Sequence, residues 1–240
     1  MTEEKGGTGR NNLTTTELLN KGLAGLKELQ TMLFPTLGNL SLLFCQRQIL
    51  EELYRKATTN PISGGQNTRV LDQVVKDFTK GYVAQIDIDN FKELNDIHGH
   101  DYGDRVLKEL YNFLYSNLRS KNSSIETEKR QEKIGEFSDM EVIHEHGEEF
   151  KILLQVGEKA IAYSIMERLR KGFFNYTRDT KTIFIFPVTF SAGLSYYNKQ
   201  EKTIEQAFKE ADKAMYEAKE MKNKTCIYRL PAHEQLELGL

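Results

Sequence analysis

The sequence predicts one α/β domain that follows a helical segment at the N-terminus. Strand-like and helix-like segments alternate between about residue 80 and residue 230, and they show no internal repeat. The chain has 240 residues, of which 39% are hydrophobic and 28% are charged. This composition is typical of one globular domain with an appendage, so we expect a single sandwich of sheet and helices.

The helical lead-in is expected to comprise residues 1–78, of which residues 1–12 are polar and predicted to be disordered. Leucines near helical spacing predict a first helix that stops at Pro35. A second helix is expected to begin at Asn39 and to end before residues 58–67, whose Asn, Pro and Gly content marks a loop.

The domain itself is expected to cover residues 79–230. It begins with a predicted strand, GYVAQIDIDNF at residues 81–91, and continues through a turn at residues 94–96 to an amphipathic helix over residues 104–118. Residues 118–138 are charged and nearly free of apolar side chains, which predicts an insertion on the surface.

The stretch VIHEHGEEFKILL, residues 142–154, predicts a hairpin. Two short apolar strands flank a tip that carries two histidines, one glycine and two adjacent glutamates. Because side chains alternate along a strand, Glu148 and Glu149 are expected to project in different directions.

After the hairpin, the sequence predicts a helix, a strand region and a final helix. The first of these covers residues 158–175, and a strand pair or one long strand covers residues 182–197. The final helix begins at Thr203 and has one apolar stripe with many small residues, which predicts close packing against the sheet.

Charge and cysteine content narrow the class of function. A net charge of −2 gives no electrostatic footprint for duplex nucleic acid. Cys45 and Cys226 lie far apart, so neither a disulfide framework nor a cysteine zinc site is indicated, and a cytoplasmic protein is expected. The best apolar stretch, LSLLFC, is far shorter than the roughly 18–20 residues of a membrane span, so we expect no membrane partner.

Two acidic clusters suggest a metal-dependent reaction. One is DIDNFKELND, which begins at Asp87, and the other contains Glu148 at the hairpin tip. Carboxylates that approach each other stay ionised most simply around a divalent cation, and oxygen ligands without cysteine suit Mg²⁺, or Mn²⁺ in its place. Mg²⁺ held together with substrate phosphates indicates phosphoryl or nucleotidyl transfer, with Lys92 or Lys219 stabilising charge.

Four blocks in order make this chain resemble the GGDEF domain family, the diguanylate cyclases. They are DIDNFKELNDIHGHDYGD at residues 87–104, HGEEF at 146–150, VTFSAGLS at 188–195 and ADKAMYEAK at 211–219. The resemblance implies a palm-like domain with a central mixed, mainly antiparallel sheet flanked by helices. It also implies that two GTP are condensed to cyclic di-GMP, with one GTP held by each subunit of a homodimer.

The resemblance assigns a role to several residues of this chain. Asp87, the backbone carbonyl of Ile88 and Glu148 would hold Mg²⁺, and Glu149 would be a further metal ligand. Glu148 would also take the proton of the ribose 3′-hydroxyl, with Glu149 as the alternative base. The remaining assigned residues are the catalytic Lys92, the guanine contacts Asn95 and Asp104, the further substrate contacts His100 and Phe91, and the triphosphate contact Lys219.

Two departures from the family pattern leave other functions open. His146 stands where the family has the first Gly of its signature, and Asn223 stands where an arginine is expected. A related palm cyclase that makes an adenine-containing cyclic dinucleotide or oligonucleotide is one alternative. A degenerate, non-catalytic module that binds GTP and regulates a partner is another.

The residues themselves also permit simpler interpretations. His98 with His100, and His144 with His146, form two H-x-H pairs that would place imidazoles on one strand face, as in a zinc or manganese hydrolase, although solvent-facing histidines are the simpler interpretation. The tail, residues 231–240, ends in QLELGL, which resembles short peptides that dock on bacterial sliding clamps. A plain tail or a last strand is the preferred interpretation.

Overall fold

The computed structural model describes residues 21–22, 24–25, 40–119 and 140–229. Several expected features lie outside these ranges: the N-terminal disordered stretch, most of the first helix, nearly all of the charged insertion, and the tail with its QLELGL motif. The expected second helix is present as α2, Leu40–Thr58.

The chain divides into two compact units, Met1–Thr59 and Asn60–Leu240. The sequence predicts a domain that starts at residue 79, whereas the second unit begins at Asn60. The segment after Asn60 is tied to the predicted hairpin, because the backbone N–H of His144 donates to the carbonyl of Gln66 at 2.8 Å. The boundary between the two units therefore lies between Thr59 and Asn60.

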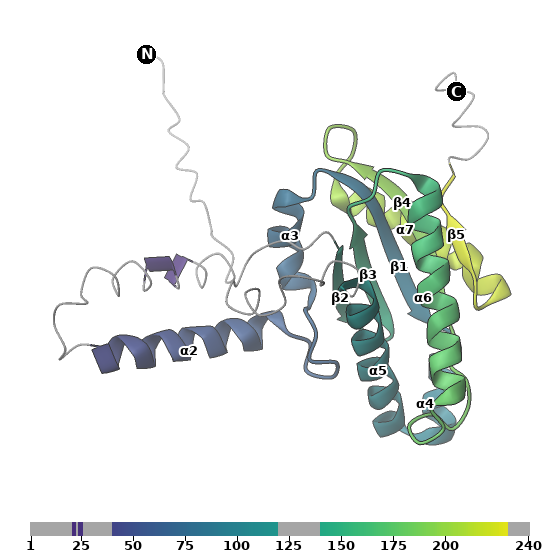
Figure 1. Cartoon of the computed structure of the whole chain (residues 1–240), viewed down its shortest axis with the longest axis horizontal. Coiled ribbons are helices and arrows are strands. Elements are labelled where there is room, and N and C mark those ends of the chain that lie inside the picture. The colour runs from purple at the N-terminus through teal and green to yellow at the C-terminus, as the bar shows by residue number, and fades with distance from the viewer. Residues whose placement is uncertain (1–20, 23, 26–39, 120–139, 230–240) are drawn as a thin grey trace, which may run out of the picture. The chain divides into compact units, whose positions relative to one another are not determined.

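Five strands form one sheet in the second unit, in the order β2-β3-β1-β4-β5 (Figure 1). The strands are β1 Lys80–Ile88, β2 Met140–His146, β3 Glu149–Leu154, β4 Phe190–Asn198 and β5 Thr225–Ile227. All neighbours pair antiparallel except β4 and β5, which are parallel. The expected mixed, mainly antiparallel sheet is thus confirmed.

Helices cover both faces of this sheet (Figure 1). They are α3 Leu71–Asp77, preceded by the short 3-10 helix η1 Thr68–Val70, α4 Phe91–His98, α5 His100–Arg119, α6 Lys159–Asp179 and α7 Ile204–Met221. Alternation along β1 assigns its side chains to two cores: Ala84 and Ile86 pack with residues of α5 and α6, whereas Val83 packs with residues of α3 and α7. Within the described ranges, none of the helices combines the length and apolar character needed to cross a lipid bilayer.

Helix α7 shows why its small residues matter. Thr203 caps it in a reciprocal capping box with Gln206, as a helix that begins at Thr203 requires. A Cβ on Gly193 of β4 would collide with the backbone of Ala211 and Met215 in α7. The helix therefore lies directly on the sheet, which confirms the predicted close approach and brings its C-terminal end beside the end of β1.

Three local expectations were wrong. Residues 94–96 belong to α4 and form no turn, because Asn90 in a left-handed conformation turns the chain and the helix follows at once. Residues 182–189 form no strand, and their apolar side chains divide between Phe184 in the core and the exposed Ile185. Strand β5 was not anticipated, since three residues with one flanking turn give little periodicity.

Candidate active site

The two acidic clusters meet where the central strands end. In the register of β1 with β3, Asp87 lies opposite Glu149, and in its register with β4, Asp87 lies opposite Ser191. Asp87 thus shares one sheet face with Glu149, and Glu148 follows at the hairpin tip. The structure brings together residues that lie about 60 positions apart in the sequence.

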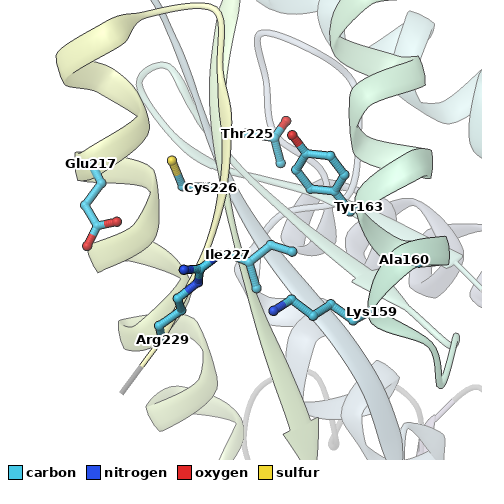
Figure 2. Close-up of a pocket in the computed structure, with 8 residues that line it drawn as sticks. All are labelled: Lys159, Ala160, Tyr163, Glu217, Thr225, Cys226, Ile227 and Arg229. Atoms are coloured by element: carbon cyan, nitrogen blue, oxygen red, sulfur yellow. The ribbon is translucent and has the colours of Figure 1, made fainter. Parts of the chain in front are cut away.

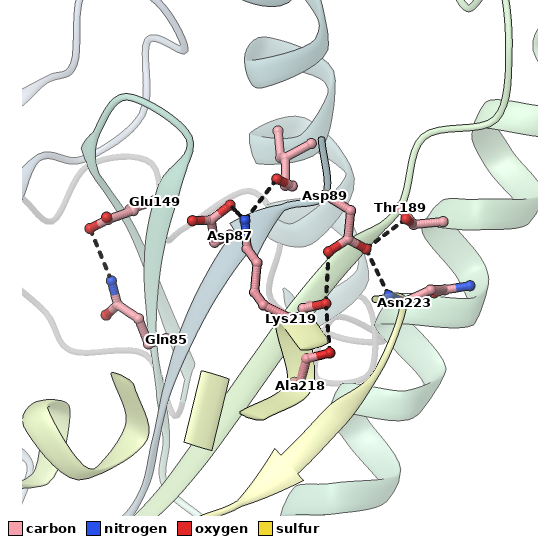
Figure 3. A network of polar contacts seen from close by, with 10 residues as sticks. Gln85, Asp87, Asp89, Glu149, Thr189, Ala218, Lys219 and Asn223 are labelled. Carbon is pink, nitrogen blue, oxygen red and sulfur yellow. Dashed lines mark hydrogen bonds and ion pairs between the residues drawn. The ribbon is translucent and has the colours of Figure 1, made fainter. Parts of the chain in front are cut away.

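A lysine on α7 binds two oxygens at this end of β1 (Figure 3). The ammonium group of Lys219 donates to Asp87 Oδ1 and, at 3.1 Å, to the carbonyl oxygen of Ile88. Burial raises the pKa of Asp87 to about 6, even though Lys219 acts to lower it; Glu148 and Glu149 act to raise it. Lys219 therefore compensates only part of the cost of ionising Asp87, and a further cation would favour the ionised form.

The hairpin tip is tighter than the sequence analysis assumed. Gly147 has φ of +53°, a left-handed conformation that glycine adopts without strain, and it links β2 directly to Glu148. Glu149 accepts from the amide of Gln85 at 3.4 Å and lies 3.4 Å from the imidazole of His146. Burial raises the pKa of the Glu149 carboxyl, against the opposing effect of His146.

His144 does not belong to the tip. It lies buried in β2, stacked on Phe150 with ring centroids 4.3 Å apart, and its ring nitrogens contact Ser63 Oγ at 2.9 Å and the Gly147 carbonyl at 2.8 Å. Burial lowers its pKa. A register shift lies between His144 and His146, and of the two only His146 is exposed, so this H-x-H pair is not the shared metal-binding face that was considered.

The other H-x-H pair is not on a strand at all. His98 ends α4 and packs against the rings of Tyr102 and Phe186, whereas His100 begins α5 and is exposed. The glycine between them, Gly99, has φ of +84°. The structure therefore gives this pair no common face for a metal.

Helices α4 and α5 carry the remaining predicted contacts. The side-chain oxygen of Asn95 is buried and has no hydrogen-bond partner among the described residues. It is close to Gly103, where a Cβ would collide with it, so Gly103 provides its space. Phe91 is buried in the core, and its substrate role stays a prediction. Lys92, His100 and Asp104 are exposed.

Asp89 is a buried residue that the sequence analysis left without a role. Its carboxylate accepts from Thr189 Oγ1 at 2.6 Å, Ser191 Oγ at 2.7 Å and the backbone N–H of Asn223 at 2.8 Å (Figure 3). It therefore joins the ends of β1 and β4 to the turn after α7. The alternation of acidic residues in DID was a local signal for Asp89. Its partners lie 100 to 134 positions away and gave no such signal.

Comparison with known proteins identifies the family. Residues 66–127 and 137–225 match the family described as diguanylate cyclase, GGDEF domain. The chain belongs to the GGDEF domain family. Diguanylate cyclase A of Treponema denticola is 32% identical over 140 residues, which cover 58% of this chain and 32% of that protein.

Two further GGDEF proteins place the chain among distant relatives. Diguanylate cyclase DgcP of Pseudomonas aeruginosa is 31% identical over 182 residues, which cover 71% of this chain and 24% of that protein. The chain thus spans about a third or less of the lengths of diguanylate cyclase A and DgcP. The crystal structure of diguanylate cyclase SiaD with its activator SiaC, from the same bacterium, has a TM-score of 0.58 at 24% identity, and the match covers 87% of this chain and 76% of that chain. At that identity the likeness establishes the shared fold.

The structure shows the contacts of the two residues that depart from the GGDEF pattern. The imidazole of His146 is exposed and faces Glu149. Asn223 uses its side-chain oxygen to accept from Arg170 and its backbone N–H to donate to Asp89. Asn223 thus contacts both Arg170 and Asp89.

A shallow groove of about 700 Å³ lies elsewhere on the GGDEF domain (Figure 2). It is lined by Lys159, Ala160, Tyr163, Glu217, Thr225, Cys226, Ile227 and Arg229. None of the predicted site residues contributes to it, so we place the candidate chemistry at the end of β1 on the basis of the side chains that meet there.

Proposed function

We propose that this chain is a Mg²⁺-dependent nucleotidyltransferase that condenses two GTP into cyclic di-GMP with release of pyrophosphate. One observation carries the proposal: the Asp87 carboxylate and the Ile88 carbonyl both accept from the ammonium group of Lys219. Two oxygens that converge on one cation can also serve as ligands of a divalent ion. Membership of the GGDEF family supports the same reaction class.

The donor set fits Mg²⁺, or Mn²⁺ in its place. Asp87, the Ile88 carbonyl and Glu148 would hold the ion, with Glu149 opposite Asp87 as a further ligand. All are hard oxygen ligands. Burial, and to a smaller extent Glu148 and Glu149, raise the pKa of Asp87, and a bound cation would favour its ionised form. When bound, the ion would neutralise part of the negative charge of the triphosphate. Lys219 would then turn from the two oxygens toward the triphosphate.

Guanine is the base that the α4–α5 side chains suit best. Asn95 presents a buried side-chain oxygen with no partner among the described residues. Such an oxygen is costly to leave unpaired and would accept from the guanine amide edge. Asp104, exposed on α5, would accept a second hydrogen bond from the same edge, while His100 contacts the substrate from the start of that helix.

The chemical step is the attack of a ribose 3′-oxygen on an α-phosphate. Glu148 takes the hydroxyl proton, the new O–P bond forms, and the bond to pyrophosphate breaks. Lys92 stabilises the negative charge that develops on the leaving group. Two such steps close the ring, so each subunit of a homodimer supplies one bound GTP.

A second candidate is a GTP-binding regulatory module without catalysis. It is favoured by Asn223, whose contacts with Arg170 and Asp89 leave this position without the charge that the family pattern has there. Lys222 and Lys224 flank it and carry charge, but a lysine lacks the bidentate geometry of arginine.

Product analysis separates these functions. The purified full chain is incubated with Mg²⁺ and each labelled nucleoside triphosphate, alone and in pairs, and the products are separated by thin-layer chromatography. We expect cyclic di-GMP from GTP alone. A product that requires ATP would reassign the chain to the adenine-using palm cyclases, and GTP binding without any cyclic product would leave the regulatory module.

A further inference from the structure

Three potential metal ligands gather on the hairpin beside the candidate active site. Glu145 and Glu149 each present a carboxylate oxygen and His146 presents a ring nitrogen, and these atoms lie within 4.8 Å of one another. The grouping follows from the bulge in β2, which pairs His146 with Glu149 and leaves Glu145 as the extra residue. A regular strand would have separated Glu145 from His146 by alternation.

A buried amide lies against this cluster. Gln85 is 3% exposed, and its Nε2 donates to Glu145 Oε2 at 3.2 Å and to Glu149 Oε2 at 3.4 Å. Its other polar atom, Oε1, is buried with no hydrogen-bond partner among the described residues. A half-turn of the amide exchanges these two atoms within the same shape. The exchange would aim a neutral oxygen at the cluster, where a cation would stabilise it.

The two carboxylates hold more negative charge than their neighbours balance. Lys151 binds Glu145, and the His146 imidazole pairs with Glu149 at 3.4 Å. Glu145 and Glu149 bring two carboxylates into the same 4.8 Å cluster, so their like charges repel each other. A second cation at this position would relieve that repulsion.

We propose that Glu145, His146 and Glu149 form a binding site for a divalent transition-metal ion. Two carboxylates and one imidazole are ligands that suit Zn²⁺, Co²⁺ and Mn²⁺, whereas Mg²⁺ prefers oxygen alone. Ligands about 2.1 Å from one tetrahedral ion lie about 3.4 Å apart, so atoms that are up to 4.8 Å apart in the cluster must approach by up to about 1.4 Å. The His146 side chain is 73% exposed and free to make that movement.

This site differs from the proposed Mg²⁺ site and does not depend on cyclase activity. It uses His146, which the family pattern replaces by glycine, and Glu145, which has no role in the proposed reaction. Glu149 belongs to both, so an ion held by His146 would draw this carboxylate away from Asp87. An ion in the transition-metal site would thereby remove one ligand from the proposed Mg²⁺ site.

Direct Co²⁺ binding tests the proposal. The full chain, stripped with a chelator, is titrated with Co²⁺ without nucleotide and in excess Mg²⁺, and binding is followed by visible absorption and calorimetry. A Cys45→Ser background removes the exposed thiol as a competing ligand. We expect one saturable site that His146→Ala weakens by at least about tenfold, with loss of the absorption band.

Two further variants make the result specific. Glu145→Gln should also weaken Co²⁺ binding, whereas His100→Ala, which removes another exposed histidine, should leave it unchanged. Equal Co²⁺ affinity in His146→Ala and the parent chain, or no saturable Co²⁺ binding in the parent, would overturn the proposal. Because no nucleotide is present, neither outcome depends on whether the chain is a cyclase.

Discussion

At the end of β1, Asp87 and Ile88 offer two oxygens to the single ammonium group of Lys219. Desolvation of a carboxylate at this position is opposed only in part by that lysine, which is why the pKa of Asp87 is still raised to about 6. A divalent ion would compensate the charge more fully than a lysine does. Cation binding would therefore explain why the oxygens of Asp87 and Ile88 converge, which packing alone does not explain.

Glu148 should be essential for turnover and dispensable for folding. Glu148→Gln keeps the size of the side chain but removes both the proton acceptor and a charged metal ligand, so we expect at least about a 10²-fold loss of cyclic product. Glu158→Gln, at an exposed position before α6, is the matched control. Unchanged turnover in Glu148→Gln would reject its catalytic role, and circular dichroism would verify the fold.

Asn95 should set the affinity for guanine. Asn95→Ala removes a hydrogen bond worth about 1–3 kcal/mol to a buried partner, so KM for GTP should rise by about 5- to 150-fold. Asn112→Ala, an exposed position further along α5, is the control. If KM for GTP and the preference over ATP both stay constant in Asn95→Ala, the assignment of the base-binding position is wrong.

At the scale of elements, α7 positions Lys219 because the helix approaches the sheet closely. Gly193→Ala places a methyl group against backbone atoms of Ala211 and Met215, which cannot rotate away. We expect a loss of about 1–3 kcal/mol in the free energy of unfolding. Gly157→Ala, whose added Cβ meets nothing within 4 Å, should cost far less in urea unfolding. Equal stability of the two variants would contradict the close contact.

Helix α6 is tied to the same region through Arg170, which also forms an ion pair within the helix. Arg170 donates from two nitrogens to Glu167, at 2.8 and 2.7 Å, and this pairing lowers the pKa of Glu167 to about 2. Arg170 also donates to Asn223, which in turn contacts Asp89. The chain of contacts joins α6 to the end of β1.

The ion pair should make stability depend on pH. The folded pKa of Glu167 lies below its unfolded value of about 4.5, so its contribution is complete above that value and is lost as pH falls toward about 2. The free energy of unfolding of the parent should exceed that of Glu167→Gln by up to about 3 kcal/mol at about pH 6, and this difference should shrink by more than half at about pH 3. A difference that does not change with pH would show that the pair contributes little.

At the scale of the whole molecule, the sequence predicted most of the architecture. The strand of DIDNF, the hairpin around HGEEF and the helix that begins at Thr203 each carry a local signal, namely alternation, a glycine turn or an apolar stripe. Residues 182–189 have a strand-like composition but form a loop, because Phe184 fills the core while Ile185 remains exposed. Composition cannot reveal which of these side chains finds a place in the core.

The candidate site was predicted less completely than the fold. Family resemblance placed Asp87, Glu148 and Glu149 together, and the strand register agrees for Asp87 and Glu149. Contacts over long sequence separations, such as Lys219 with Asp87 across 132 positions, follow from packing that no local pattern encodes. The bulge that separates His144 from His146 likewise depends on the partner strand.

We propose that two copies of this chain join two GTP at paired half-sites. Pyrophosphate and cyclic di-GMP are therefore measured together, from GTP and Mg²⁺, over a range of concentrations of the full chain. We predict two pyrophosphates for each cyclic di-GMP and a rate per molecule that rises with protein concentration, with neither product formed by Glu148→Gln. GTP that binds but releases no pyrophosphate at any concentration would contradict the claim.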